Sequence, residues 1–303
     1  MTLKTKLSGL GFGIVLLMSL AAAQNAKAEP RAELGEEGRT QAQAADRGVQ
    51  LRLYYEEKTV NGDTRKTPKL DIRVQNVSVL SLTGEEGWQK WPSALAQVVE
   101  MDPSNPYPEV VFSTYSGGAH CCNIVQIALS SADGKSWRKI DAGSFNGDVF
   151  GARDVDRDGR FEMVTRDNRF YYMFSSYAGS VAPTQIKALQ NGKMVDVTRE
   201  PRFRPFLLRE HAEIRKWMGD ITKAPEKNGF LAGYVAQSAL VGDGAQAWKF
   251  MLKYYDRTAI AGLEDCVAGY DDQGKCKAAE IKYKDFPHAL AGFLRRTGYL
   301  PAQ

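Results

Sequence analysis

A short acidic run is the part of this 303-residue sequence whose residue types and spacing most clearly suggest chemistry. Carboxylates occupy every second position, a glycine follows, and a fourth carboxylate comes three residues later: Asp154, Asp156, Asp158, Gly159 and Glu162. Ca²⁺ prefers six to eight oxygen ligands at short range, and a tight loop can direct several carboxylates at one point. The sequence therefore predicts a calcium loop whose ligands are Asp154, Asp156, Asp158, the carbonyl of Arg160, and Glu162.

This loop differs from an EF-hand. An EF-hand carries a bidentate Glu at loop position twelve and lies between two helices. Position twelve here is Thr165, and Phe161 to Thr165 has the pattern of a strand. The competing interpretation is a solvated acidic turn, because Asp and Gly are common turn residues.

A second unusual segment is the turn Gly117-Gly118-Ala119-His120-Cys121-Cys122. In one interpretation, the two cysteines form a vicinal disulfide that stiffens the turn and offers an apolar sulfur surface to a ligand. In another, His120 and the thiolates bind a soft or borderline metal such as Cu or Zn. In a third, one cysteine is buried and inert or pairs with the C-terminal part. The candidate ligand-binding residues are Gly117, Gly118, His120, Cys121 and Cys122.

The other two cysteines, Cys266 and Cys276, are close in sequence, and Gly269 and Gly274 allow the segment between them to bend. Exported proteins form disulfides readily. We therefore expect a Cys266–Cys276 disulfide.

No catalytic motif is evident. The sequence lacks the local signatures of serine hydrolases, zinc proteases, phosphate loops and dinucleotide-binding folds. Ser116 lies near His120, but no acid is placed to orient that histidine. A non-catalytic binding or scaffold protein is therefore favoured. The alternative is a cell-envelope enzyme, a hydrolase or a redox or metal-handling protein, centred on His120, Cys121 and Cys122.

The N-terminal residues have the pattern of a secretory signal. Lys4 and Lys6 precede an apolar run from Leu10 to Ala23, and Ala26-Lys27-Ala28 fits a signal-peptidase site. Residues 1–28 are thus an expected signal peptide, and the mature protein is expected in the periplasm or outside the cell. No membrane span is expected after cleavage.

Removal of this signal takes away Lys4, Lys6 and Lys27 and no acid, which lowers the formal net charge from +4 to +1. A nearly neutral protein gives no electrostatic reason to bind nucleic acid or an anionic membrane. The expected partner is an unidentified envelope protein or a small ligand.

The remaining chain divides into three parts. Residues 29–46 are polar, show no strand pattern and are expected to form a leader. Residues 47–200 contain a series of short apolar runs separated by turn residues, which indicates a β domain. Residues 201–303 have helical periodicity, as in Pro205 to Met218. The fold class expected is α+β, mainly β.

Two segments of the β region look like copies of each other. Pro108-Glu109-Val110-Val111 matches Phe161-Glu162-Met163-Val164, with the two glutamates 53 positions apart. This period suits a four-stranded propeller blade. The residues before the first copy, Asp102 to Pro106, retain few ligands, so we expect no metal there.

With Phe150-Gly151 upstream, the acidic run and the strand after it resemble an FG-GAP/VCBS repeat, the blade unit of integrin-type β-propellers. The resemblance implies a structural Ca²⁺ held by Asp154, Asp156, Asp158, the Arg160 carbonyl and Glu162. The turn Gly117 to Cys122 also resembles a segment of uncharacterised exported bacterial proteins with this repeat. About 150 β-rich residues are too few for a closed ring. We therefore expect a small or incomplete blade-like sheet.

Overall fold

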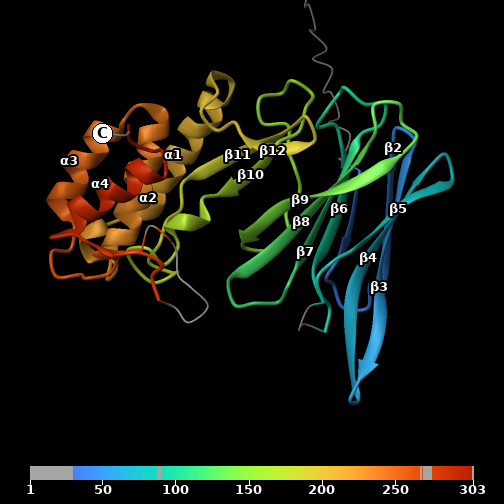
Figure 1. The fold of residues 1–303 in the computed structure, drawn as a ribbon, viewed down its shortest axis with the longest axis horizontal. Coiled ribbons are helices and arrows are strands. Elements are labelled where there is room, and N and C mark those ends of the chain that lie inside the picture. Colours follow the sequence, from blue (N-terminus) through green and yellow to red (C-terminus); the bar gives the residue numbers. More distant parts are fainter. Residues whose placement is uncertain (1–29, 87–89, 267, 269–274, 302–303) are drawn as a thin grey trace, which may run out of the picture.

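The computed structural model describes residues 30–86, 90–266, 268 and 275–301. The expected signal peptide, residues 1–28, lies outside the described residues. Figure 1 shows a β-rich body joined to a group of helices. Among the described helices, none combines the length and the apolar composition needed to cross a bilayer.

The first sheet is a meander of four antiparallel strands, in the order β2-β3-β4-β5. Its strands are β2 (Gln41–Asp46), β3 (Val49–Val60), β4 (Asp63–Val74) and β5 (Val77–Thr83). The long hairpin of β3 and β4 turns at Asn61 and Gly62, whose φ angles are 53° and 89°. Asn-Gly is the preferred pair for such a turn because both residues tolerate positive φ.

The second sheet has five antiparallel strands in the order β1-β6-β7-β8-β9. They are β1 (Arg31–Leu34), β6 (Ala94–Val99), β7 (Glu109–Tyr115), β8 (Cys121–Ser130) and β9 (Trp137–Asn146). The first two sheets share one core, in which Leu53 and Ile72 of the first sheet belong to the same buried cluster as Val98 and Phe112 of the second. The turn Gly117 to Cys122 connects β7 to β8, and the acidic loop follows β9.

The expectation of a strandless leader at residues 29–46 is wrong. β1 pairs with β6, and β2 pairs with β3. The apolar residues of these strands are few and small: Ala32 and Leu34 are buried, and Ala42 and Ala44 are partly buried. Because the pairing depends mainly on backbone hydrogen bonds to a partner strand, the local sequence carries little strand signal.

The third sheet leads from the β body to the helices. It consists of β10 (Met163–Arg166), β11 (Thr184–Gln190) and β12 (Lys193–Asp196). The helices are α1 (Arg204–Met218), α2 (Lys227–Val241), α3 (Gly244–Tyr254) and α4 (Phe286–Arg296). Short elements complete the chain: η1 (Asn168–Phe170), η2 (Pro201–Phe203), η3 (Ile221–Lys223) and the pair β13 (Glu264–Asp265) and β14 (Ile281–Lys282).

The helices pack on the third sheet. Ile186 of β11 and Phe206 of α1 belong to one buried cluster. Phe170 and Phe174, from the segment after β10, lie in the helical core, where both meet Phe293 of α4 edge to face. The fold is therefore α+β and mainly β, and the sheets of the described chain do not close into a propeller.

Candidate functional site

The acidic loop lies between β9 and β10 and is closed by a backbone bridge. Arg153 and Glu162 exchange two backbone hydrogen bonds, each of 2.9 Å. Within the loop, Arg157 and Gly159 have φ angles of 66° and 88°. Glycine adopts this left-handed conformation without steric cost, so Gly159 permits the tight turn between the third aspartate and the strand.

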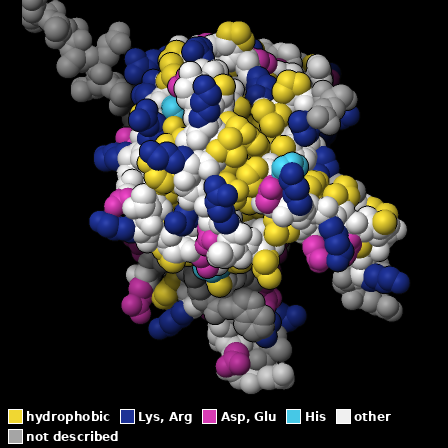
Figure 2. Space-filling view, turned by 90° about the vertical axis from the view of Figure 1, so that its left-hand side faces the viewer, with side chains coloured by type: hydrophobic (Ala, Val, Ile, Leu, Met, Phe, Trp, Pro, Cys, Tyr) yellow, Lys and Arg dark blue, Asp and Glu magenta, His cyan; other side chains and the backbone are white. Residues whose placement is uncertain are grey.

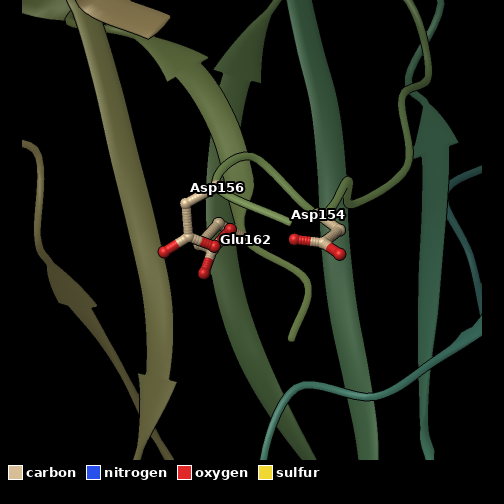
Figure 3. A group of neighbouring side chains, drawn as sticks. All are labelled: Asp154, Asp156 and Glu162. Carbon is tan, nitrogen blue, oxygen red and sulfur yellow. The ribbon is translucent and has the colours of Figure 1, made fainter. Parts of the chain in front are cut away.

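Three of the four predicted carboxylates come together. Asp154, Asp156 and Glu162 each offer one oxygen, and these oxygens lie within 4.8 Å of one another (Figure 3). Asp158 is engaged elsewhere: its carboxylate accepts hydrogen bonds from Nε and Nη2 of Arg160, at 3.0 and 2.6 Å. Asp154 also accepts the backbone N–H groups of Asp158 and Gly159, both at 3.1 Å, and thereby holds the turn.

The group is partly withdrawn from water. Glu162 is 1% exposed, and burial raises the pKa of its carboxyl to about 7, with the neighbouring Asp156 adding to the shift. The backbone N–H of Val155 donates to Glu162 Oε2 at 3.2 Å and opposes this shift. A buried carboxylate beside two others is costly unless a positive charge lies close by.

Arg202 supplies such a charge from η2, at the start of the helical part. Its Nη1 atom lies 3.1 Å from Asp156 Oδ2, 3.2 Å from Asp158 Oδ2 and 3.6 Å from Glu162 Oε1. The sequence gives no signal that Arg202 belongs to this loop, because the three carboxylates lie 40 to 46 positions before it. The loop thus presents oxygen ligands suited to a hard cation, with a guanidinium already close to three of its carboxylates.

The first copy of the repeat has a matching acid in a different setting. Glu109 is fully buried, and burial raises the pKa of its carboxyl to about 7. Its Oε2 accepts the N–H groups of Met101 at 2.7 Å and Asp102 at 3.0 Å. Its Oε1 accepts the side-chain amide of Asn105 at 2.6 Å. Neutral hydrogen-bond donors therefore satisfy both carboxylate oxygens of Glu109.

At the second candidate site, Cys121 is bonded to Cys122, and Cys266 is bonded to Cys276. This matches the vicinal-disulfide interpretation and the expected second pairing. It contradicts the metal-binding interpretation, because a disulfide leaves no thiolate. It also contradicts the third interpretation, because the two cysteines are bonded to each other and neither is free or paired with the C-terminal part. Ser116 fixes the turn: its hydroxyl accepts the N–H of Cys122 at 2.9 Å, and its own N–H donates to the carbonyl of Cys122 at 3.0 Å.

The glycines of this turn have separate structural roles. Gly117 has a φ of 83°. A Cβ atom on Gly118 would collide with the carbonyl oxygen of Cys121. Side chains are therefore disfavoured at both positions, in the first by backbone conformation and in the second by space.

His120 is exposed and belongs to a stack of rings that sequence reasoning missed. Its ring lies 4.2 Å from that of Tyr177, with an angle of 10° between the planes. Tyr177 in turn stacks on Tyr171 at 4.7 Å. Within the described residues, no hydrogen bond or ion pair joins His120 to a carboxylate. The aromatic run Phe170 to Phe174 makes Tyr171 noticeable in the sequence, but no sequence pattern points to Tyr177.

The other two histidines have local structural roles. Nε2 of His211 lies 2.9 Å from the hydroxyl of Ser238 in the helical core, and burial lowers the pKa of this imidazole. His288 pairs with Asp285, which also accepts the backbone N–H of His288 and so caps α4.

Comparison with known proteins identifies relatives over most of the chain. The sll0997 C-terminal domain matches residues 208–298, which contain α2, α3, α4 and nearly all of α1. A Synechocystis protein named "Probable thylakoid lumen protein sll0997" is 46% identical over 257 residues, which cover 84% of this chain and 74% of the relative.

A second relative is much longer than the matched segment. "Uncharacterized protein y4bJ" of Sinorhizobium fredii is 32% identical over 225 residues, 73% of this chain but 35% of that protein. No solved structure matches the chain. The extent and identity of the Synechocystis match show that this chain belongs to the family of the protein sll0997.

Proposed function

We propose that this protein is an exported, non-catalytic binding or scaffold protein whose β region carries one structural Ca²⁺ in the loop from Asp154 to Glu162. The observation that carries the proposal is the convergence of Asp154, Asp156 and Glu162, whose oxygens lie within 4.8 Å of one another. Oxygen-only ligands at such spacing suit a hard cation better than a soft one.

Calcium would relieve an electrostatic cost that is built into the loop. Glu162 is buried beside Asp156, and Arg202 is the one residue in the described part of the chain that forms ion pairs with both. The Ca²⁺ would be held by Asp154, Asp156 and Glu162, and the Asp158 carboxylate and the Arg160 carbonyl are the further oxygens that the repeat resemblance assigns. When bound, the ion would tie the loop to β10 and so stiffen the junction between the β body and the helices.

The binding surface proposed is the turn Gly117 to Cys122 with the rings stacked on it. The disulfide, the exposed ring of His120 and the half-buried ring of Tyr177 together offer a rigid, largely apolar surface at the turn between β7 and β8. Tyr172, which is 62% exposed and also contacts Tyr177, extends it. Rigid aromatic surfaces lose little side-chain entropy on binding, which favours contact with a ligand or an envelope protein.

The location proposed is the periplasm or the cell exterior. It rests on the signal pattern of residues 1–28 and on the name of the Synechocystis relative, which refers to a lumen, a compartment also reached by export. The two disulfides agree with an oxidising compartment.

Thermal unfolding with and without calcium tests the proposal. At free calcium one hundred times Kd, a single site adds about 2.7 kcal/mol, which corresponds to a rise in Tm of roughly 5–10 °C for a protein of this size. Asp156→Ala should lose the rise, whereas Asp141→Ala, an exposed acid on β9, should keep it. An unchanged Tm in the wild type, or an equal rise in Asp156→Ala, would overturn the calcium assignment.

A further inference from the structure

An apolar groove runs along α3 and α4 on the side of the molecule away from the β body. It consists of two adjoining hollows, of about 610 and 760 Å³, which share Trp248, Ala291 and Arg295. The first is also lined by Leu252, Tyr283, Pro287, His288 and Gly292. The second is also lined by Val235, Ala239, Gly242, Gly244, Ala245, Lys249, Tyr299 and Leu300. We call the two together the α3–α4 groove.

The surface of the groove is largely apolar. Leu252 is 41% exposed, and Trp248 is partly buried between the two hollows. Figure 2 shows hydrophobic side chains gathered in the middle of this helical face, with Lys and Arg side chains around them. An apolar patch rimmed by polar groups typically marks a surface that another molecule covers.

The described charged residues of the groove carry one sign. None of the described residues that line the two hollows is Asp or Glu, and the charged ones are Lys249 and Arg295. Neither forms an ion pair with any of the residues that the structure describes. His288, which also lines the groove, is already paired with Asp285. A complementary molecule would therefore combine an apolar ridge with negative charge.

We propose that the α3–α4 groove binds an acidic amphipathic helix of a partner protein. An amphipathic helix fills a groove between two helices by laying its apolar face into it. α3 has 11 residues, so at 1.5 Å per residue the groove accommodates about 16 Å, or three turns, of such a helix. Carboxylates flanking the apolar ridge would meet Lys249 on one wall and Arg295 on the other.

Shape and charge set this occupant apart from two others. A bilayer surface is bound by protruding apolar side chains, whereas Trp248 and Ala291 are partly buried and line both hollows. The chain's own residues 1–28 contain Lys4, Lys6 and Lys27 and no acid, so they have the wrong charge for this groove. The walls α2, α3 and α4 all lie within residues 208–298, the segment that matches the sll0997 C-terminal domain.

The test titrates the full-length mature protein with a synthetic helical peptide that has Leu at positions i, i+3, i+4 and i+7 and Glu on the flanks. A second peptide keeps the Leu positions and carries Lys in place of Glu. Binding is followed by tryptophan fluorescence, and Trp248→Phe identifies the signal from the groove. We expect saturable binding of the Glu peptide with a Kd at least tenfold lower than that of the Lys peptide.

Charge reversal provides the matched control. Lys249→Glu with Arg295→Glu should weaken the Glu peptide at least tenfold and should strengthen the Lys peptide. Lys58→Glu with Lys193→Glu, two exposed lysines on β3 and β12, makes the same change in net charge and should leave both affinities unchanged. Far-UV circular dichroism and Tm confirm that each variant is folded.

Four outcomes would overturn the proposal. The first two are equal affinity for the two peptides and no binding of either. The third is sedimentation with phosphatidylglycerol vesicles that depends on Lys249 and Arg295, without binding of the Glu peptide. The fourth is a dimer that the Leu252→Glu substitution dissociates but the Glu peptide does not. The test does not involve the calcium loop, so its result is independent of the function proposed above.

Discussion

Glu109 and Glu162 make the same hydrogen bond at two places in the fold. Glu109 Oε2 accepts the N–H of Asp102 at 3.0 Å, and Glu162 Oε2 accepts the N–H of Val155 at 3.2 Å. The two acceptors and the two donors are each 53 positions apart. The copies differ in what faces the other carboxylate oxygen, which is the Asn105 amide in the first and the Arg202 guanidinium in the second. We infer that neutral hydrogen-bond donors satisfy the carboxylate of the first copy and that the carboxylates of the second copy suit a bound cation.

Replacing Glu109 by Gln should change how stability depends on pH. The folded-state pKa of Glu109 is raised to about 7 from an ordinary value of 4.5, so the folded state holds its proton more tightly than the unfolded chain does. The stability from this group is fully present below pH 4.5 and is lost as pH rises towards 7. This loss amounts to at most about 3 kcal/mol in the wild type, and Glu109→Gln should reduce it. The free energy of unfolding in urea, at pH 5 and at pH 8, measures the difference. An equally steep fall in the variant would contradict the assignment.

Replacing Arg202 by Gln should have opposite effects on stability and on calcium affinity. Without calcium, the carboxylates of Asp156, Asp158 and Glu162 lose their shared cation, and we expect a loss of about 1–3 kcal/mol. With calcium, removal of a nearby positive charge should lower Kd several-fold. Arg157→Gln is the control, because Arg157 is exposed in the same loop. The account would be contradicted if Arg202→Gln raised Kd or left the unfolding free energy unchanged.

The Gly118 position tests the turn at His120. Gly118→Ala introduces a Cβ that meets the carbonyl oxygen of Cys121, and such a clash should destabilise the protein by about 1–3 kcal/mol. Loss of the His120–Tyr177 stack should also change the near-UV circular dichroism. Ala119→Ser, at the exposed neighbouring position, should leave both measurements as in the wild type. If both substitutions behaved alike, the turn would be more adaptable than described.

Removing the second disulfide should lower stability without affecting calcium binding. Cys266 and Cys276 are 10 positions apart in the connection between α3 and α4, and closing a loop of this length contributes about 2–3 kcal/mol in the chain-entropy account. The double variant Cys266→Ser with Cys276→Ser should lose that amount in urea unfolding. Its Kd for calcium should match the wild type, because the pair lies outside the β region. A changed calcium affinity in the double variant would contradict this expectation, because it would show that the disulfide and the calcium loop are coupled.

Elements with strong local signals could be predicted from the sequence. The periodic spacing from Pro205 to Met218 predicts a helix, and α1 spans Arg204–Met218. Asp285 before Phe286 predicts an N-cap, and its carboxylate accepts the N–H of His288. These features depend on neighbours within a few positions, where propensity and capping rules apply.

Features that depend on distant neighbours could not be predicted. Arg202 meets Asp156 across 46 positions, and His120 meets Tyr177 only because β8 and the segment before β11 lie side by side in the fold. β1 and β2 became strands through pairing with β6 and β3 rather than through their own residues. The acidic motif was visible, but the orientation of Asp158 towards Arg160 was not, since its spacing is identical to that of its neighbours.

Isothermal titration calorimetry measures how many calcium ions each chain binds. We expect one ion per wild-type chain, at the Asp154 loop and not at the Glu109 copy, and none in Asp156→Asn. Zero or two ions per wild-type chain, or one ion that Asp156→Asn still binds, would contradict it.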